Sequence, residues 1–75
     1  MDINEFVDRV SEQFDDATGL TAETKFRDVE GWSSIVGLSI IAMADEEYGV
    51  ELSGDDVRSS QTIQDLYGKV LAKKG

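Results

Sequence analysis

The sequence contains no cysteine, no histidine and no proline. Without cysteine the chain has no disulfide, no thiolate metal ligand and no cysteine nucleophile, so any thiol chemistry requires a group added to the protein. Without histidine it lacks the side chain that most often transfers protons near neutral pH. An enzyme is therefore the weakest functional class, and we expect no catalytic residue. The lack of proline also argues against a flexible interdomain tail.

Basic residues and long apolar runs are scarce as well. Seven lysines and arginines stand against sixteen aspartates and glutamates, which gives a net charge of −9. This charge opposes binding to nucleic acid and to anionic membrane surfaces, and it favours basic protein partners. The longest apolar run, Ile40 to Ala44, has five residues, far short of the ~20 residues that span a bilayer. The first residues lack the pattern of a secretory signal, so we expect a cytoplasmic protein.

The length of the chain limits its organisation. Seventy-five residues allow one domain, and we expect a single domain over residues 1–75 that acts as a monomer. A chain of this size buries only about 60% of its unfolded surface and cannot enclose a large active site. A function that depends on a partner protein fits this size better than one that needs a deep cleft.

Apolar spacing predicts three longer helices and one short helix. From Asp2 to about Asp16, apolar residues recur every three or four positions, as on one face of a helix, and Asp2 can cap its start. A second helix is expected from Ser34 to Tyr48, with Gly49 as its end.

The rest of the chain divides into a long loop and two further helices. Residues 17–33 show no sustained period, but bulky side chains such as Phe26 and Trp32 indicate a loop held against the core, with a partner contact as the alternative for Trp32. Residues 53–59 allow one or two helical turns, and Thr62 begins a last helix in which Gly68 is a weak point. We therefore predict an all-α fold, a small acidic four-helix bundle with a long loop between helices one and two.

Two hydroxyls stand at the start of the expected second helix, on Ser33 and Ser34. The default interpretation is an N-cap, whose replacement by alanine costs about 1 kcal/mol of helix stability. A phosphate attached there would also be stabilised, because the first backbone N–H groups lack partners and the helix dipole is positive at this end. The residues alone leave both interpretations open.

The sequence around these serines resembles the acyl carrier protein family. Trp32-Ser33-Ser34-Ile35 is followed by an apolar helix and then by the segment DEEYGVEL at residues 45–52. The family motif is Asp-Ser-Leu, followed by a helix that closes in Glu-Glu, an aromatic residue, glycine and a β-branched or leucine pair. The resemblance covers nearly the whole chain and is strongest over residues 29–52.

The resemblance places Ser34 on the serine that the family modifies. It implies that a phosphopantetheinyl transferase attaches a 4′-phosphopantetheine arm from coenzyme A to Ser34 through a phosphodiester. The thiol of the arm would carry acyl groups as thioesters between biosynthetic enzymes, so the protein would be a carrier without catalytic residues. The sequence leaves open whether the cargo is a fatty acyl, polyketide, aminoacyl or other group.

The second helix is apolar around most of its circumference, which predicts both an inward and an exposed apolar side. We expect Ile40, Ala44 and Tyr48 to form an inward line. The other side should be partly exposed, including Val36. The resemblance implies that acyl-processing enzymes with basic docking surfaces bind this helix, and the residues expected to bind them are Ile35, Val36, Leu38, Ala42, Asp45 and Glu46.

Six carboxylates and no base lie between Asp45 and Asp56. A solvated face is the default interpretation. The alternating oxygen ligands and glycine turn of an EF-hand are absent, so we expect no metal site. A glycosidase-like carboxylate pair would need a cleft that the chain is too small to enclose. The remaining interpretation is a surface that attracts basic enzymes, and the neighbouring serine motif favours it.

The sequence departs from the family motif at the start of the second helix. Ser33 stands where an aspartate usually precedes the modified serine, and Val36 and Ser39 stand where the family often has acids. These differences indicate dedicated partners rather than the general fatty-acid enzymes. The alternative function is an unmodified, carrier-like protein–protein interaction module that binds its partner through the exposed apolar helix.

Overall fold

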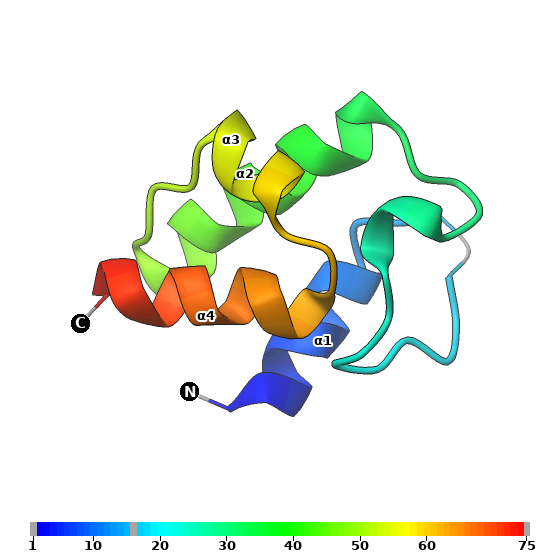
Figure 1. Cartoon of the computed structure of the whole chain (residues 1–75), viewed down its shortest axis with the longest axis horizontal. Coiled ribbons are helices and arrows are strands. Elements are labelled where there is room, and N and C mark those ends of the chain that lie inside the picture. Colours follow the sequence, from blue (N-terminus) through cyan, green and yellow to red (C-terminus); the bar gives the residue numbers. More distant parts are fainter. Residues whose placement is uncertain (1, 16, 75) are drawn as a thin grey trace.

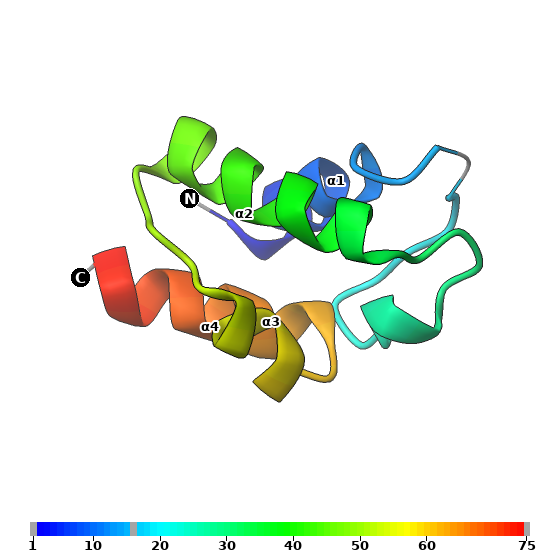
Figure 2. The ribbon, with the colours of Figure 1, turned by 90° about the horizontal axis from the view of Figure 1, so that it is seen from above.

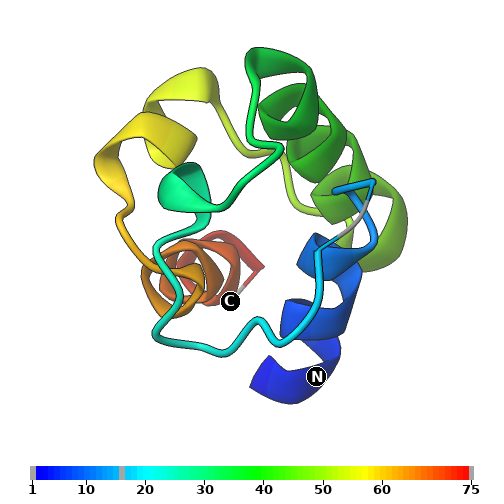
Figure 3. The same ribbon diagram turned by 90° about the vertical axis from the view of Figure 1, so that its right-hand side faces the viewer.

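The computed structural model describes residues 2–15 and 17–74. These residues form four α-helices and no strand, which confirms the predicted all-α fold (Figure 1). Viewed roughly along the last helix, the four helices lie around a shared centre (Figure 3). The elements in chain order are α1 (Ile3–Ser11), the 3-10 helix η1 (Phe26–Asp28), α2 (Ser34–Tyr48), α3 (Gly54–Ser59) and α4 (Ile63–Lys74).

The core lies where α1, α2 and α4 meet. Phe6 of α1, Ile40 of α2 and Leu66 of α4 are fully buried. The ring of Phe6 packs against two tyrosines, with ring centroids 5.9 Å from Tyr48 and 5.4 Å from Tyr67. One apolar cluster therefore fixes three helices to one another. None of the described helices has the length and apolar character needed to cross a membrane.

Helix α1 is shorter than predicted. Asp2 caps its start, accepting hydrogen bonds from the N–H groups of Asn4 and Glu5, but the helix ends at Ser11 rather than near Asp16, which lies outside the described residues. Tighter turns follow, in which the N–H of Phe14 donates to the carbonyl of Ser11. Acidic residues are repelled by the negative, C-terminal end of the helix dipole. The acid-rich segment after Ser11 therefore disfavours a longer helix.

Helix α2 has the predicted bounds, and Gly49 ends it. Gly49 adopts a left-handed conformation with φ +65°, and its N–H donates to the carbonyls of Ala44 and Asp45. The Lys74 ammonium donates to the Tyr48 carbonyl at 3.2 Å. Ile40 and Ala44 are fully buried as predicted. The end of α2 is therefore closed by a glycine turn and by a cation, both of which suit its unpaired carbonyl groups.

The predicted exposure of Val36 is wrong, because the side chain is only 8% exposed. Val36 lies one turn before Ile40, and residues four apart share one face of a helix. It therefore belongs to the inward line of Ile40 and Ala44 and not to the exposed side.

The loop between α1 and α2 is held against the core, as its bulky side chains predict. Phe26 of η1 is fully buried, and the Trp32 ring lies 5.6 Å from it in an edge arrangement. The loop backbone also accepts from the start of α4, where the N–H of Ile63 donates to the carbonyl of Thr24 at 3.0 Å. The apolar spacing did not predict η1. Figure 2 shows that the chain runs from η1 directly to the first residue of α2.

Capping boxes begin both helices of the C-terminal half. Ser53 and Asp56 exchange hydrogen bonds at α3, and Thr62 and Asp65 do so at α4. The backbone N–H of Ser53 lowers the pKa of Asp56, and that of Thr62 lowers the pKa of Asp65, because each bond favours the ionised carboxylate. Both caps are consequently formed by charged carboxylates at neutral pH.

Gly68 offers a simple test of the last helix. It lies exposed inside α4, and a Cβ built there would meet nothing within 4 Å. We expect Gly68→Ala to stabilise the protein by about 1 kcal/mol, because alanine is the better helix former. Gly49→Ala is the matched control and should destabilise it by about 1–2 kcal/mol through its left-handed backbone alone. Urea denaturation followed by circular dichroism measures both, and a destabilised Gly68→Ala protein would contradict the structure of α4.

Candidate functional site

Two neighbouring serines at the start of α2 have different roles. Ser33 is the N-cap, and its Oγ accepts a hydrogen bond from the N–H of Val36 at 3.3 Å. Ser34 is the first residue of the helix and is exposed. Within residues 2–15 and 17–74, its hydroxyl has no hydrogen-bond partner. The sequence left the capping residue open, and the structure assigns the cap to Ser33, so the Ser34 hydroxyl is free.

The positive end of α2 is not neutralised by the protein. The first turns of α1, α3 and α4 all contain acidic residues, whereas the first turn of α2 contains none. Among the described residues, the N–H groups of Ser34 and Ile35 have no acceptor. This helix end can therefore accept a negative group from outside the chain.

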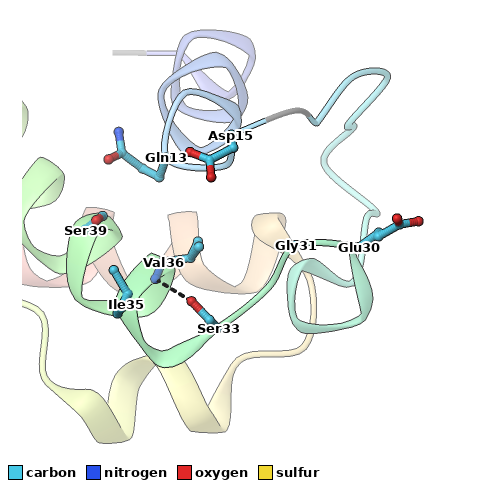
Figure 4. Close-up of a pocket in the computed structure, with 8 residues that line it drawn as sticks. All are labelled: Gln13, Asp15, Glu30, Gly31, Ser33, Ile35, Val36 and Ser39. Carbon is cyan, nitrogen blue, oxygen red and sulfur yellow. Dashed lines mark hydrogen bonds between the residues drawn. The ribbon is translucent and has the colours of Figure 1, made fainter.

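Two hollows of opposite charge flank the start of α2. On one side, Ser34 borders a groove of about 340 Å³ between η1, α2 and α3. The lining of this groove contains two arginines and no acid. Its principal residues are Arg27, Trp32, Leu38, Ile41, Val57 and Arg58. On the other side, Ser33 borders a hollow of about 580 Å³ that contains two acids and no base. Figure 4 shows Asp15 of this acidic hollow on the α1 side, facing α2, and Glu30 at its edge. The two serines therefore stand in opposite electrostatic surroundings.

Trp32 lines the groove and lies over Gly37. A Cβ built on Gly37 would lie 3.1 Å from Cη2 of the Trp32 ring, which is too close for most side chains. The ring also packs against Phe14, with centroids 6.3 Å apart. Gly37 thus makes room for the indole, and Trp32 serves as a loop anchor that also lines the groove.

The chain matches known proteins over most of its length. Residues 4–70 match the family model described as "Phosphopantetheine attachment site". A protein of Solidesulfovibrio magneticus named "Acyl carrier protein" is 35% identical over 60 residues, which cover 80% of this chain and 77% of that protein. The chain belongs to the acyl carrier protein family. No solved structure matches it.

The family match gives the site its chemistry. Proteins of this family attach phosphopantetheine and act as carriers rather than catalysts, and they interact with enzymes. The start of α2 fits such a group, because it offers a free, exposed hydroxyl beside an unneutralised helix end and an open groove. The described residues contain no group of three or more acidic side chains that could hold a metal ion.

The residues predicted to bind partner enzymes of this carrier lie mostly on its surface. Ile35 is 74% exposed and Leu38 is 65% exposed. Ala42, Asp45 and Glu46 are also exposed and continue the same side of α2 at helical spacing. Buried Val36 is the exception. The five exposed residues form one stripe, which we call the α2 stripe (Ile35, Leu38, Ala42, Asp45 and Glu46).

The sequence did not reveal the two arginines of the groove. Arg27 is in η1 and Arg58 is in α3, and only the folded chain brings them to the same side of α2. Neither residue has a motif around it. Only the composition drew attention to them, because basic residues are scarce in a chain with a net charge of −9.

Proposed function

We propose that the protein is an acyl carrier protein loaded on Ser34 with 4′-phosphopantetheine from coenzyme A. In its loaded form it carries acyl intermediates as thioesters between biosynthetic enzymes. A phosphopantetheinyl transferase and acyl-processing enzymes with basic docking surfaces are its partners. The same proposal places the carrier in the cytoplasm as a monomer, whose net charge of −9 repels other copies.

The observation that carries the assignment to Ser34 is the contrast with Ser33. The Ser33 oxygen is occupied by the cap of α2 and borders the acidic hollow of Asp15 and Glu30. The Ser34 oxygen is free and borders the groove of Arg27 and Arg58. A phosphodiester would be repelled at the first position and attracted at the second. This electrostatic difference supports the residue that the family motif also indicates.

Loading joins the Ser34 oxygen to the β-phosphorus of coenzyme A. The Ser34 hydroxyl attacks this phosphorus, the P–O bond to the other phosphate breaks, and adenosine 3′,5′-bisphosphate leaves. The hydroxyl proton passes to a base of the transferase, which also supplies Mg²⁺ to neutralise the phosphates. The chain contributes the exposed oxygen and the unpaired N–H groups of Ser34 and Ile35, which favour the negative product. The attached group supplies the thiol that forms thioesters.

The α2 stripe suits a carrier that visits several enzymes. Ile35 and Leu38 offer apolar contact close to Ser34, and Asp45 and Glu46 offer negative charge at the other end of the helix. Among the described residues, neither of these acids forms an ion pair within the chain, so both are available to a basic partner. Exposed ion pairs contribute only about 0–1 kcal/mol each, which permits rapid release.

An unmodified interaction module is the second candidate. The first observation in its favour is Ser33, which replaces the acid that usually precedes the modified serine. The second is the exposure of Ile35 and Leu38, which would bind a partner without any arm. This candidate requires the same α2 stripe but no reaction at Ser34.

Intact mass spectrometry separates the two candidates. The purified protein is incubated with coenzyme A, Mg²⁺ and each of several broad-specificity transferases. We expect its mass to increase by one phosphopantetheinyl group. An established carrier protein treated in parallel confirms that each transferase is active. No increase with any active transferase would favour the interaction module.

A further inference from the structure

We propose that the groove beside Ser34 binds acyl groups that end in a carboxylate, in preference to plain hydrocarbon chains. This inference rests on the proposed function, because the acyl group would reach the groove from Ser34. It adds the class of cargo, which the sequence left open.

The charge of the groove is the first support. Its lining contains two arginines and no acid, although the chain has sixteen acids and only seven bases. The acidic hollow on the other side of α2 has the reverse composition. Arg58 is paired with Asp55, which is not part of the lining, whereas Arg27 forms no ion pair with the described residues. The groove thus presents at least one unpaired guanidinium on a strongly negative protein, and this cation complements an anion.

Arg27 is already positioned for this role. Its Nη2 atom donates to the Ser60 carbonyl at 2.9 Å, and its guanidinium carbon lies 6.0 Å from the centre of the Phe26 ring. A guanidinium has five N–H donors in a rigid plane, and this bond to Ser60 occupies one side of it. The remaining donors can meet a carboxylate, often through two parallel hydrogen bonds.

Arg58 borders the groove from α3 and is held less firmly. It pairs with the exposed Asp55, and its side chain covers Gly54, where a built Cβ would lie 3.1 Å from Nη1. The side chain of Arg58 is 71% exposed. Such an exposed pair contributes little energy, so Arg58 can exchange Asp55 for another carboxylate at low cost.

The apolar part of the groove is formed by a few side chains. Trp32 fills the space over Gly37, and fully buried core residues such as Ile40 and Leu66 are not part of its lining. Leu38, Ile41 and Val57 form its apolar wall. A short acyl group with a charged end matches an apolar wall bordered by two guanidinium groups.

The test compares two cargoes of equal carbon number on Ser34. Apo protein is loaded by a broad-specificity transferase with the amide analogues of succinyl- and butyryl-coenzyme A, and intact mass confirms each product. The terminal carboxylate of the succinyl group carries ¹³C, and NMR follows its titration. We expect its pKa to be about 1 unit lower than in an Arg27→Gln/Arg58→Gln double variant, because nearby cations favour the ionised form. The double variant Lys25→Gln/Lys74→Gln is the control, because it removes the same charge outside the groove and should retain the low pKa.

A second measurement needs no variant. The chain has one tryptophan, and this residue lines the groove, so its indole N–H gives a single NMR signal that reports on the groove. We expect the succinyl group to shift this signal at least twice as far as the butyryl group. Equal shifts, or an equal carboxylate pKa in the wild type and the arginine variant, would overturn the inference while leaving the carrier function intact. Failure of both analogues to load, with an active transferase, would contradict the proposed function and the inference together.

Discussion

We expect that replacing Ser34 with alanine abolishes the gain of one phosphopantetheinyl group, whereas Ser33→Ala retains it. The first variant would remove the hydroxyl that, of the two serines described at the start of α2, borders the groove with the two arginines. The second removes the hydrogen bond to the N–H of Val36 and should cost about 1 kcal/mol of stability without removing the acceptor oxygen. Intact mass after incubation with coenzyme A and a transferase measures the loading of both.

The two serine variants control for each other. Ser34 makes no hydrogen bond with the described residues, so Ser34→Ala should unfold at nearly the same urea concentration as the wild type. A loss of loading in that variant then reports chemistry and not unfolding. A loaded Ser34→Ala protein, or an unloaded but folded Ser33→Ala protein, would contradict the assignment of the two hydroxyls.

Phe6→Ala has the largest expected effect on stability. Phe6 is fully buried and packs against the rings of Tyr48 and Tyr67, so it joins α1 to α2 and α4. Truncation of a buried phenylalanine costs about 3–5 kcal/mol, a large share of the roughly 5–15 kcal/mol that holds a domain folded. We expect the urea midpoint to fall steeply and a substantial fraction of the protein to be unfolded at 37 °C.

Leu38→Ala is the matched control for this loss. Leu38 is also a large apolar side chain, but it is 65% exposed on α2. Its truncation should change stability by no more than about 0.5 kcal/mol, as is typical of surface substitutions. If Leu38→Ala and Phe6→Ala destabilise the protein equally, the division of α2 and α1 into buried and exposed sides is wrong.

The sequence predicted helices most accurately where local signals agree. Helix α2 begins after Ser33, whose side chain caps it, and ends before Gly49, whose left-handed backbone stops it. Helix α1 has a cap at Asp2 but no comparable stop, so its end near Ser11 depends on charge and on the packing of Phe14, which spacing does not reveal.

The exposed side of α2 was only partly predictable. When apolar residues surround a helix, spacing gives two candidate faces without saying which one is buried. Ile35 and Leu38 are exposed as expected, but Val36 lies on the line of Ile40 and Ala44 and is buried. The neighbouring helices decide this, and they are not visible in the sequence of α2 alone.

The groove could not be predicted, because its parts come from distant segments. Arg27, Ser34 and Arg58 have no common motif, and their proximity depends on the course of the long loop and on the Arg27 bond to the Ser60 carbonyl. The motif alone could indicate a modified serine. The charge around that serine, which distinguishes it from its neighbour, required the fold.

The most direct test of the central claim is to locate the attached group by fragmentation mass spectrometry of the loaded protein. The structure and the family predict a phosphopantetheinyl group on Ser34 alone, with Ser33 unmodified. A group found on Ser33, or a folded protein that no active transferase can load, would contradict the claim that the free hydroxyl at the start of α2 is the attachment point.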